Sequence, residues 1–427
     1  MQAILSVSVA LLAGLILSRF AKLAKLPAVT AYLVAGILVG PYCLGLFGVE
    51  GLGFISMENV EEYSIFAEVA LGFIAFSIGN EFRISQLKKI GKQATMIGVF
   101  QAVFTSVLVA AVLVGLHFII PDKLSLPAAL VLGAIASATA PAATLMVVKQ
   151  YKAKGPVTDM LLPVVALDDA VGLMIFAILY GVAKAIISGR VDILSVVVEP
   201  ILEVVLSLLL GLVMGLLFTF GEKFFHSNSK RMALSVTFVM LTVAISMLKF
   251  EVGGVHVSFS SLLVCMMLGT VFCNICDFSE ELMERVDKWS GPLLILFFVL
   301  SGAELELSVF ADVAIIIVGV VYIISRSVGK IVGAFASAKL VKCEKNIVKY
   351  LGITLLPQAG VALGMAMKAS TGLGEVGVIV SNVTLFAVLI YELVGPLMTK
   401  IALTKAGDIK PEGKTSAREK VIAEKTK

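Results

Sequence analysis

Two adjacent aspartates lie in the middle of an otherwise apolar stretch of the chain. Asp168 and Asp169 interrupt a hydrophobic run that extends from Val164 to Phe176. A centrally placed Asp costs about 2.5–3.5 kcal/mol to insert into a bilayer, so two of them need a cavity, a counter-charge or a bound cation. One carboxylate can hold a proton or a monovalent cation, but not both comfortably. The pair therefore predicts a site where protons and cations compete, which is the chemistry that antiport requires.

Two basic residues further along the chain can supply the counter-charge. Arg326 and Lys330 are four residues apart in an apolar segment, so they lie on one side of a helix. Lys330 matches the expected depth of Asp168 better, although the sequence leaves open which of the two bases pairs with it. Lysine can change its protonation state when it is buried, whereas arginine stays charged. We expect Lys330 to take part in proton traffic and Arg326 to be a fixed charge; the alternative is a purely structural Asp168–Lys330 pair.

The composition is that of a polytopic membrane protein. Of the 427 residues, 59% are hydrophobic and only 15% are charged, which excludes a soluble domain with a water-facing surface. The net charge of +4 comes from short loops and the tail, so we expect contacts with lipid headgroups and none with nucleic acid. Five scattered cysteines do not form a disulfide framework. We expect no cofactor.

The distribution of basic residues predicts the topology. Dividing the chain into apolar stretches of about 20 residues gives thirteen membrane spans. Most of the 34 lysines and arginines then fall on one side, which is the cytoplasmic side by the positive-inside rule. This predicts an all-α, multi-pass protein of the plasma membrane, with its N-terminus outside and its C-terminus in the cytoplasm. Residues 1–403 would form the membrane domain, and residues 404–427 a charged, disordered tail.

Two of the expected spans are interrupted at corresponding positions. The fifth span contains Ser137 and Thr139 before Pro141, and a proline there removes a helix hydrogen bond and frees carbonyl groups. The twelfth span has a similar break, formed by Pro357, Gln358 and Gly360. If residues 1–187 and 232–403 are six-helix repeats joined by a linker helix at 193–220, each break falls in the fifth helix of its repeat. Such repeats are inverted, and paired breaks indicate a binding site at the membrane midplane.

The breaks supply further ligands for a cation. Freed carbonyls and the hydroxyls of Ser137 and Thr139 can replace water around a small ion, with Asp169 as the ligand that carries the charge. Glu68 lies in the apolar run of the third span and is a candidate accessory acid. Glu203, near the outer third of the linker helix, is more typical of a kink or an interface.

Four motifs together resemble a known family. They are Leu26 to Pro41, Glu68 to Gly79, the Asp168–Asp169 pair, and Gly329 to Gly333 around Lys330. Their combination is similar to the monovalent cation:proton antiporter 2 family, whose members have an Na⁺/H⁺ exchanger-like membrane domain. The resemblance covers residues 1–403.

The resemblance implies a thirteen-helix inverted-repeat fold in which two broken helices cross, a core domain moves against a dimerisation domain, and the protein is a homodimer. Na⁺ or another alkali cation would be exchanged for H⁺, with Asp169 carrying the ion, Asp168 paired with Lys330 and Thr139 beside the crossing. An Asp-Asp pair resembles the electrogenic members. One departure is Ala140, where some relatives have an acid.

Three alternatives to Na⁺/H⁺ exchange stay open at this point. The first is K⁺/H⁺ or Li⁺/H⁺ exchange, because selectivity depends on cavity geometry. The second is a K⁺ efflux system of the same family, although its ligand-gating domain is missing from this sequence. The third is a cation channel, which flux coupled to protons would exclude. An intramembrane aspartyl protease is disfavoured, because adjacent residues on one helix cannot converge on a single water. We therefore expect a transporter and not an enzyme.

Overall fold

The computed structural model describes residues 2–23, 26–49, 53–79, 82–188, 199–248, 250–252, 255–304 and 313–410. These residues form an α-helical protein, as the sequence predicted, with one short β-hairpin that it did not predict. The elements are, in chain order, α1 (Gln2–Leu23), α2 (Ala28–Val39), η1 (Leu44–Phe47), α3 (Met57–Glu62), α4 (Ser64–Gly79), α5 (Ile84–His117), α6 (Leu126–Ile135), α7 (Pro141–Tyr151), α8 (Pro156–Ser188), α9 (Glu199–Glu222), α10 (Asn228–Ser246), β1 (Phe250–Val252), β2 (Val255–Val257), α11 (Ser261–Ile275), α12 (Ser279–Trp289), α13 (Gly291–Ala303), α14 (Val313–Leu340), α15 (Lys345–Thr354), α16 (Gly360–Gly372) and α17 (Glu375–Ala406).

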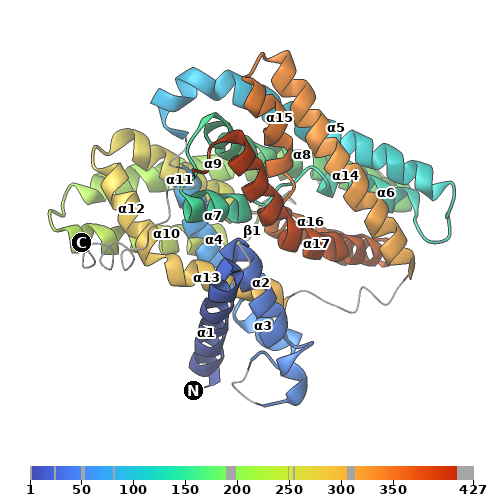
Figure 1. Ribbon diagram of the computed structural model, residues 1–427, viewed down its shortest axis with the longest axis horizontal. Helices are drawn as coiled ribbons and strands as arrows, with labels where there is room; N and C mark the ends of the chain where they lie inside the picture. The colour runs from blue at the N-terminus through green and yellow to red at the C-terminus, as the bar shows by residue number, and fades with distance from the viewer. Residues whose placement is uncertain are drawn as a thin grey trace.

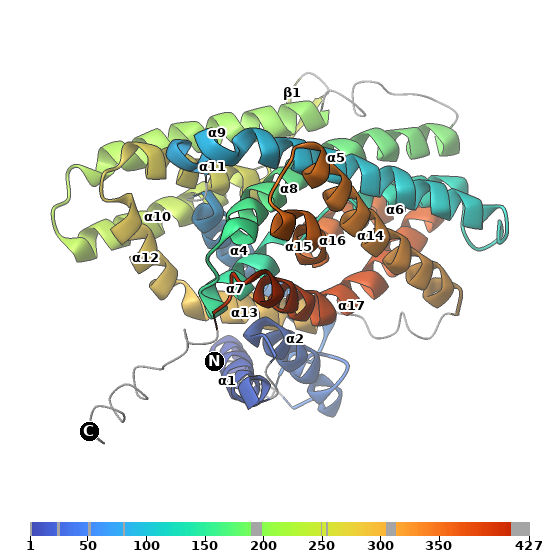
Figure 2. The same ribbon diagram turned by 45° about the horizontal axis from the view of Figure 1, so that its top comes forward.

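The helices form two groups that contact each other along one boundary. The site bundle contains α5–α8 and α14–α17, with α14 packed along α5 and α8 packed against α5 and α6. The flanking bundle contains α1, α2, α4 and α9–α13, in which α11 packs between α4 and α9 and α13 packs on α2. Figures 1 and 2 show α10 to α12 toward the left, α6 toward the right, and α7 and α15 between them, while α5 runs from the left side to the right. Asp168 and Asp169 are fully buried in this arrangement.

The interruptions predicted in the fifth and twelfth spans are present. The fifth span is divided into α6, which ends at Ile135, and α7, which begins at Pro141. The twelfth is divided into α15, which ends at Thr354, and α16, which begins at Gly360. Proline is well accommodated at the first position of a helix, where the N–H has no intrahelical partner. Pro141 therefore starts a new half-helix and does not merely bend a continuous one.

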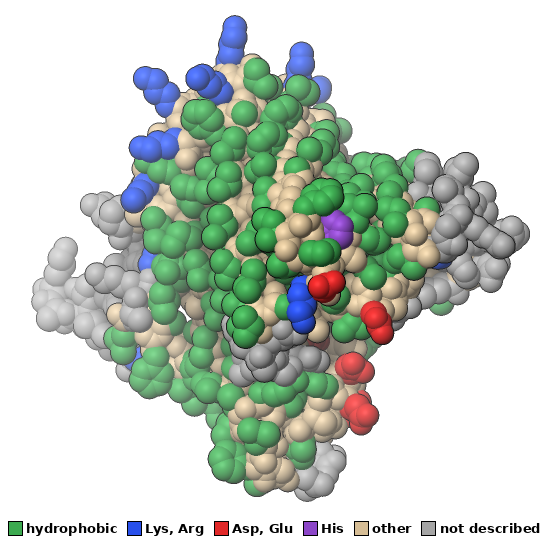
Figure 3. All heavy atoms as spheres, turned by 90° about the vertical axis from the view of Figure 1, so that its right-hand side faces the viewer, with side chains coloured by type: hydrophobic (Ala, Val, Ile, Leu, Met, Phe, Trp, Pro, Cys, Tyr) green, Lys and Arg blue, Asp and Glu red, His purple; other side chains and the backbone are tan. Residues whose placement is uncertain are grey.

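The outer surface is apolar along most of its extent. Figure 3 shows a face dominated by hydrophobic side chains, with Lys and Arg gathered at its top end. Eight of the described helices are long and apolar enough to cross a membrane, and nine are if α12 and α13, bent by 51°, form one span. The protein is thus a multi-pass membrane protein, whereas the count of thirteen spans stays a prediction.

The C-terminal helix extends past its expected end. α17 continues to Ala406, three residues beyond the predicted boundary of the membrane domain. Asp408 follows it and accepts hydrogen bonds from the backbone N–H and the hydroxyl of Thr158, at 2.7 and 2.8 Å. The end of α17 is thereby attached to the start of α8, the helix that carries the aspartate pair. Residues 411–427 of the predicted tail lie outside the described residues.

Glycines allow two pairs of flanking helices to approach closely. A Cβ on Gly36 of α2 would lie 2.0 Å from the carbonyl oxygen of Val299, and one on Gly302 of α13 would lie 2.2 Å from that of Leu33. Gly79 of α4 and Gly269 of α11 make the same reciprocal contact. Small residues at helix contacts permit such backbone proximity in membrane proteins, where the hydrophobic effect does not drive helices together.

We expect Gly302→Ala to destabilise the protein, because the new methyl group would push α13 away from α2. Overpacking of this kind costs about 1–3 kcal/mol, which should lower the thermal midpoint of the detergent-solubilised protein by several degrees. Gly291→Ala is the matched control in the same helix, since a Cβ there meets nothing within 4 Å. Equal midpoints for the two variants would contradict the close approach of α2 and α13.

Candidate functional site

The two broken helices cross and are hydrogen-bonded to each other at their breaks. The backbone N–H of Ala140 donates to the carbonyl of Pro357 at 2.8 Å. The hydroxyl of Thr139 lies 3.3 Å from the carbonyl oxygen of Leu355, to which it can also donate. Both breaks are buried, so the backbone groups freed from helical hydrogen bonds must find partners inside the protein. The crossing thus concentrates polar backbone atoms in the interior.

Arg326 of α14 binds three of those carbonyls. Its guanidinium donates to Ala136 at 3.0 Å, to Leu356 at 2.7 Å and to Ala138 at 2.6 Å, and it lies 4.4 Å from the ring centre of Tyr391. The side chain is fully buried. The guanidinium of Arg326 donates to backbone carbonyls of both breaks, so Arg326 is a fixed charge that stabilises the crossing. It is not the partner of Asp168.

Gln358 adds a second polar link across the crossing. Its amide donates to the carbonyl of Ile135 at 2.9 Å and contacts the hydroxyl of Tyr322. Gly360, two residues later, begins α16 with open space where a side chain would be. The structure therefore places Pro357, Gln358 and Gly360 at the crossing, together with Tyr322, which the sequence did not indicate because a tyrosine in an apolar span is unremarkable.

Asp168 has partners for both of its carboxylate oxygens. Oδ2 accepts hydrogen bonds from the ammonium group of Lys330 at 2.6 Å and from the hydroxyl of Thr139 at 2.5 Å. Oδ1 accepts one from the amide of Gln101, on α5, at 2.5 Å. The ammonium group of Lys330 also donates to the carbonyl of Ser137. Asp168 and Lys330 are both fully buried, so charge pairing replaces the water that each has lost. Sequence reasoning did not identify Gln101, whose amide completes this network.

Asp169 is in a different situation from its neighbour. Its side chain is 0% exposed, and neither of its oxygens has a hydrogen-bond partner among the described residues. Adjacent helical residues point about 100° apart, so Asp169 faces away from the network of Asp168. A buried carboxylate without partners is costly unless it is neutralised by a proton or a cation. The structure thus separates one acid that is fully bound from one that is free to bind.

Ser137 lies against α8 close to the aspartate pair. Its hydroxyl would be 3.0 Å from a Cβ on Gly172, which is three residues beyond Asp169 on the same helix. That hydroxyl donates to the carbonyl of Ala134 at 2.7 Å, which leaves its oxygen lone pairs available. Among the described residues, no cluster of three or more His, Cys, Asp or Glu side chains could hold a metal ion. A cation at this place would therefore depend on Asp169, hydroxyl groups and backbone carbonyls.

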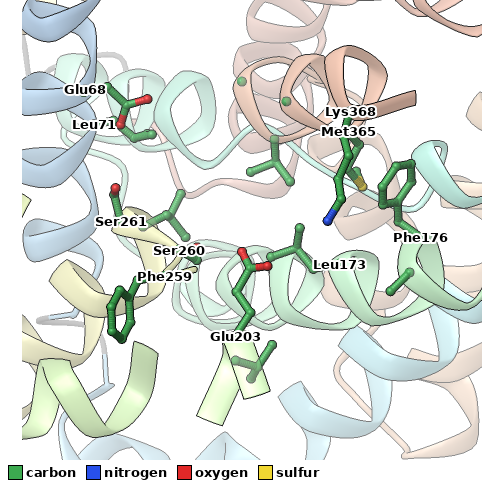
Figure 4. A pocket seen from close by; sticks show the side chains of 16 residues that line it. Glu68, Leu71, Leu173, Phe176, Glu203, Phe259, Ser260, Ser261, Met365 and Lys368 are labelled. Carbon is green, nitrogen blue, oxygen red and sulfur yellow. The ribbon is translucent and has the colours of Figure 1, made fainter. Parts of the chain in front are cut away.

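A cavity of about 300 Å³ lies between the two bundles, beyond the aspartate pair. Leu173, one turn after Asp169 on α8, lines it, whereas Asp169 does not. Three charged residues also line it, namely Glu68 of α4, Glu203 of α9 and Lys368 of α16. In Figure 4 the ends of Glu203 and Lys368 point toward one another across the cavity. The sequence treated Glu68 and Glu203 separately, and only the packing of α4 against α11 and α11 against α9 brings them to one cavity.

Comparison with known proteins agrees with this geometry. The sequence model of the family described as "Sodium/hydrogen exchanger, transmembrane" matches residues 7–405. The chain belongs to the sodium/hydrogen exchanger family. The resemblance found in the sequence is thereby confirmed, and the protein is a cation:proton antiporter, hence a transporter and not an enzyme.

A curated relative and two solved structures are similar to the exchanger. The Na⁺/H⁺ antiporter NhaS4 of Synechocystis sp. is 25% identical over 417 residues, which cover 93% of this chain and 95% of the relative. Two structures of the sodium proton antiporter MjNhaP1 from Methanocaldococcus jannaschii share the fold. One has a TM-score of 0.63 at 19% identity and covers 97% of this chain and 100% of its own. The other has a TM-score of 0.70 at 17% identity, with coverage of 97% and 99%.

We predict that Asp168→Asn and Lys330→Met each destabilise the exchanger, because each leaves a buried charge without its partner. Breaking a buried pair from one side costs about 3–5 kcal/mol, so the thermal midpoint in detergent should fall clearly for each single variant. The double variant removes both charges and should lose less than the sum of the two. Strictly additive losses would mean that Asp168 and Lys330 do not stabilise each other.

Proposed function

We propose that the exchanger moves Na⁺ against H⁺ by alternating access, with the two ions competing for Asp169. The observation that carries the proposal is that Asp169 is fully buried and has no hydrogen-bond partner among the described residues. A bound proton or a bound monovalent cation each neutralises this carboxylate, and one excludes the other. Transport then requires only that the site open to one side at a time.

The surroundings of Asp169 support a small desolvated cation. Ser137 contributes a hydroxyl oxygen beside α8 close to the aspartate pair, and the breaks contribute carbonyls that are not used within a helix. Thr139 is already donating to Asp168, so its oxygen can accept a cation without losing that bond. Pro141 and Pro357 maintain the breaks from which these groups come. Glu68 lines the neighbouring cavity, where an acidic side chain raises the local cation concentration.

We assign Lys330 a second role in the cycle. Asp168 can contact a cation bound at Asp169 only if it gives up part of its bond to Lys330. A lysine that loses its buried counter-ion releases a proton readily. One Na⁺ would then replace two protons, one from Asp169 and one from Lys330, and the exchange would be electrogenic. Arg326 keeps its charge throughout, because it is bound to the crossing.

Na⁺ is proposed as the cation because both named relatives are described as sodium antiporters. K⁺ and Li⁺ are the alternatives, and the same groups could bind either. A dye-quench assay in proteoliposomes, with each cation added in turn, distinguishes the three. Flux of a cation without accompanying protons in this assay would indicate a channel.

The topology and assembly belong to the same proposal. We place the exchanger in the plasma membrane. Basic side chains gather at one end of its apolar face (Figure 3), which the positive-inside rule makes the cytoplasmic end, and we place the N-terminus outside. The site bundle would be the moving core, and the flanking bundle would carry the homodimer contact. The repeats at 1–187 and 232–403 and the linker at 193–220 follow from the matching positions of the two breaks.

We predict that Asp169→Asn abolishes exchange and leaves a folded, extractable protein. The substitution keeps the volume of the side chain but removes the only group for which proton and cation compete. Asp159→Asn is the matched control, because it makes the same change at an exposed position near the start of the same helix. Cation-dependent proton flux at the wild-type level in Asp169→Asn would contradict the mechanism.

We also predict a characteristic pH dependence of cation affinity. Only the ionised acid binds the cation, so apparent affinity should weaken about tenfold per unit as pH falls below the pKa of the carrying acid, and level off above it. Because Asp168, Asp169 and Lys330 interact, that pKa belongs to the cluster as a whole. Added cation should lower it. An affinity that is constant between about pH 5 and 8 would show that the two ions do not share a site.

A further inference from the structure

α17 contains a second buried carboxyl group that the antiport site does not use. Glu392 lies near the middle of this helix and is only 3% exposed. Its Oε2 atom is buried and has no hydrogen-bond partner among the described residues. A carboxylate at such a depth in a membrane protein is expensive and is usually compensated by a partner, a proton or water. Glu392 therefore needs an explanation that packing does not supply.

The position of Glu392 is at the boundary between the two bundles. Tyr391, the residue before it, donates from its hydroxyl to the carbonyl of Ile323 on α14, within the site bundle, at 2.7 Å. Leu393, the residue after it, accepts through its carbonyl from the hydroxyl of Thr30 on α2, in the flanking bundle, at 3.4 Å. The two residues that flank Glu392 thus contact both bundles, one through its side chain and one through its carbonyl, so any movement of one bundle against the other changes the surroundings of Glu392.

The same stretch of α17 also contacts the crossing of the broken helices. A Cβ on Gly395 would lie 2.9 Å from the Cα atom of Pro357, which shows that the two backbones touch. Gly395 is three residues after Glu392, so the carboxyl group lies within one helical turn of this contact. A change in charge at Glu392 can therefore affect both the boundary and the crossing.

Among the residues that the structure describes, no basic side chain bonds to the buried Oε2 atom of Glu392. Glu304, which follows α13, is an acid and offers no positive charge. The basic groups on the neighbouring helices α14 and α7 are engaged elsewhere: Arg326 with carbonyls, Lys330 with Asp168, and Lys149 with Asp287. The remaining titratable or charged groups on helices packed against α17 are Tyr32 of α2, Tyr151 of α7, Asp159, Asp169, Tyr180 and Lys184 of α8, Tyr322 and Lys339 of α14, Lys345, Lys349 and Tyr350 of α15, and Lys368 of α16.

We propose that Glu392 is a second proton-binding site, in which the proton stabilises the packing of α17 against the flanking bundle in this conformation. With the proton bound, the carboxyl group is neutral and its burial is tolerated. When the proton leaves at alkaline pH, an uncompensated charge is created at the boundary. The exchanger then shifts away from this conformation toward one in which Glu392 reaches water, and the turnover rate changes while cation binding at Asp169 does not.

The experiment compares Glu392→Gln with the wild type in the full-length protein, without added cation. Gln resembles the protonated acid in shape and charge, so the two proteins should be most alike at low pH, where the acid is protonated in the folded and the unfolded state. A carboxyl that keeps its proton in the folded protein but loses it when unfolded makes stability fall as pH rises. The thermal midpoint of the wild type should therefore decrease as pH rises above about 4, the ordinary pKa of a glutamate, and level off once the folded protein has also lost the proton. That of Glu392→Gln should decrease less over this range. Glu392→Asp retains an acid and should restore the decrease.

Glu375→Gln is the matched control, because it makes the same substitution at an exposed position in the first turn of the same helix. It should follow the wild type at every pH. Infrared spectroscopy gives a direct readout, since the C=O band of a protonated carboxylic acid should be weaker in Glu392→Gln at neutral pH and unchanged in Glu375→Gln. Both measurements are independent of the proposed transport mechanism. They can fail while the role proposed for Asp169 holds, and they can succeed while that role is disproved.

Transport in proteoliposomes completes the test, and this part alone rests on the proposed function. Glu392→Gln should keep the wild-type KM for the cation and the wild-type rate at neutral pH, and differ in rate only on the alkaline side. Identical pH profiles of stability and rate in Glu392→Gln and the wild type would overturn the proposal. Loss of exchange at every pH in a folded Glu392→Gln protein would also overturn it, because Glu392 would then belong to the transport cycle itself.

Discussion

The burial of two adjacent carboxylates in an apolar interior is the constraint on which the rest of the structure depends. Each must be neutralised or hydrogen-bonded, and the protein treats them differently. Asp168 receives three side-chain donors, one of them the ammonium group of Lys330, whereas Asp169 receives none among the described residues. The first acid is therefore part of the fold, and the second keeps its capacity to bind. Adjacent positions on one helix make this division possible, because they face different neighbours.

The crossing of the broken helices meets the same constraint for the backbone. Freed carbonyls in a membrane interior need donors, and Arg326 supplies them for both breaks from a single side chain. The positive charge of Arg326 is thereby committed to structure, which leaves Lys330 as the base that can exchange partners. Glycine contacts in the flanking bundle provide the complementary rigidity, since α2 with α13, and α4 with α11, are in backbone contact. In the proposed cycle, this rigid flanking bundle would be the surface against which the site bundle moves.

Much of this arrangement could be predicted from the sequence, because its signals are local and costly. A single sequence shows charged residues in apolar runs, prolines in the middle of a span and the depth of a residue along a helix. These signals identified Asp168, Lys330 and both breaks. Gln101 and Tyr322 could not be found in this way, since a single neutral polar residue in a span carries no periodic or energetic signature. The meeting of Glu68 with Glu203 depends on how α4, α11 and α9 pack, and no pattern within one segment encodes it. Glu392 was missed because its significance is the lack of a partner, which only the packed structure shows.

The network around Asp168 bears on how the proposed cation would bind at the site. Thr139 and Lys330 both donate to the same oxygen of Asp168, and Lys330 also donates to the carbonyl of Ser137. A cation placed between the two aspartates would repel the ammonium group and compete with it for both of these acceptors. In the proposed mechanism, cation binding and the loss of charge on Lys330 would therefore accompany each other, because a bound cation beside a charged lysine would place two positive charges on one buried carboxylate. The hydrogen bonds of the site in this conformation would then be the ones that a cation replaces, which would couple ion binding to rearrangement of the crossing.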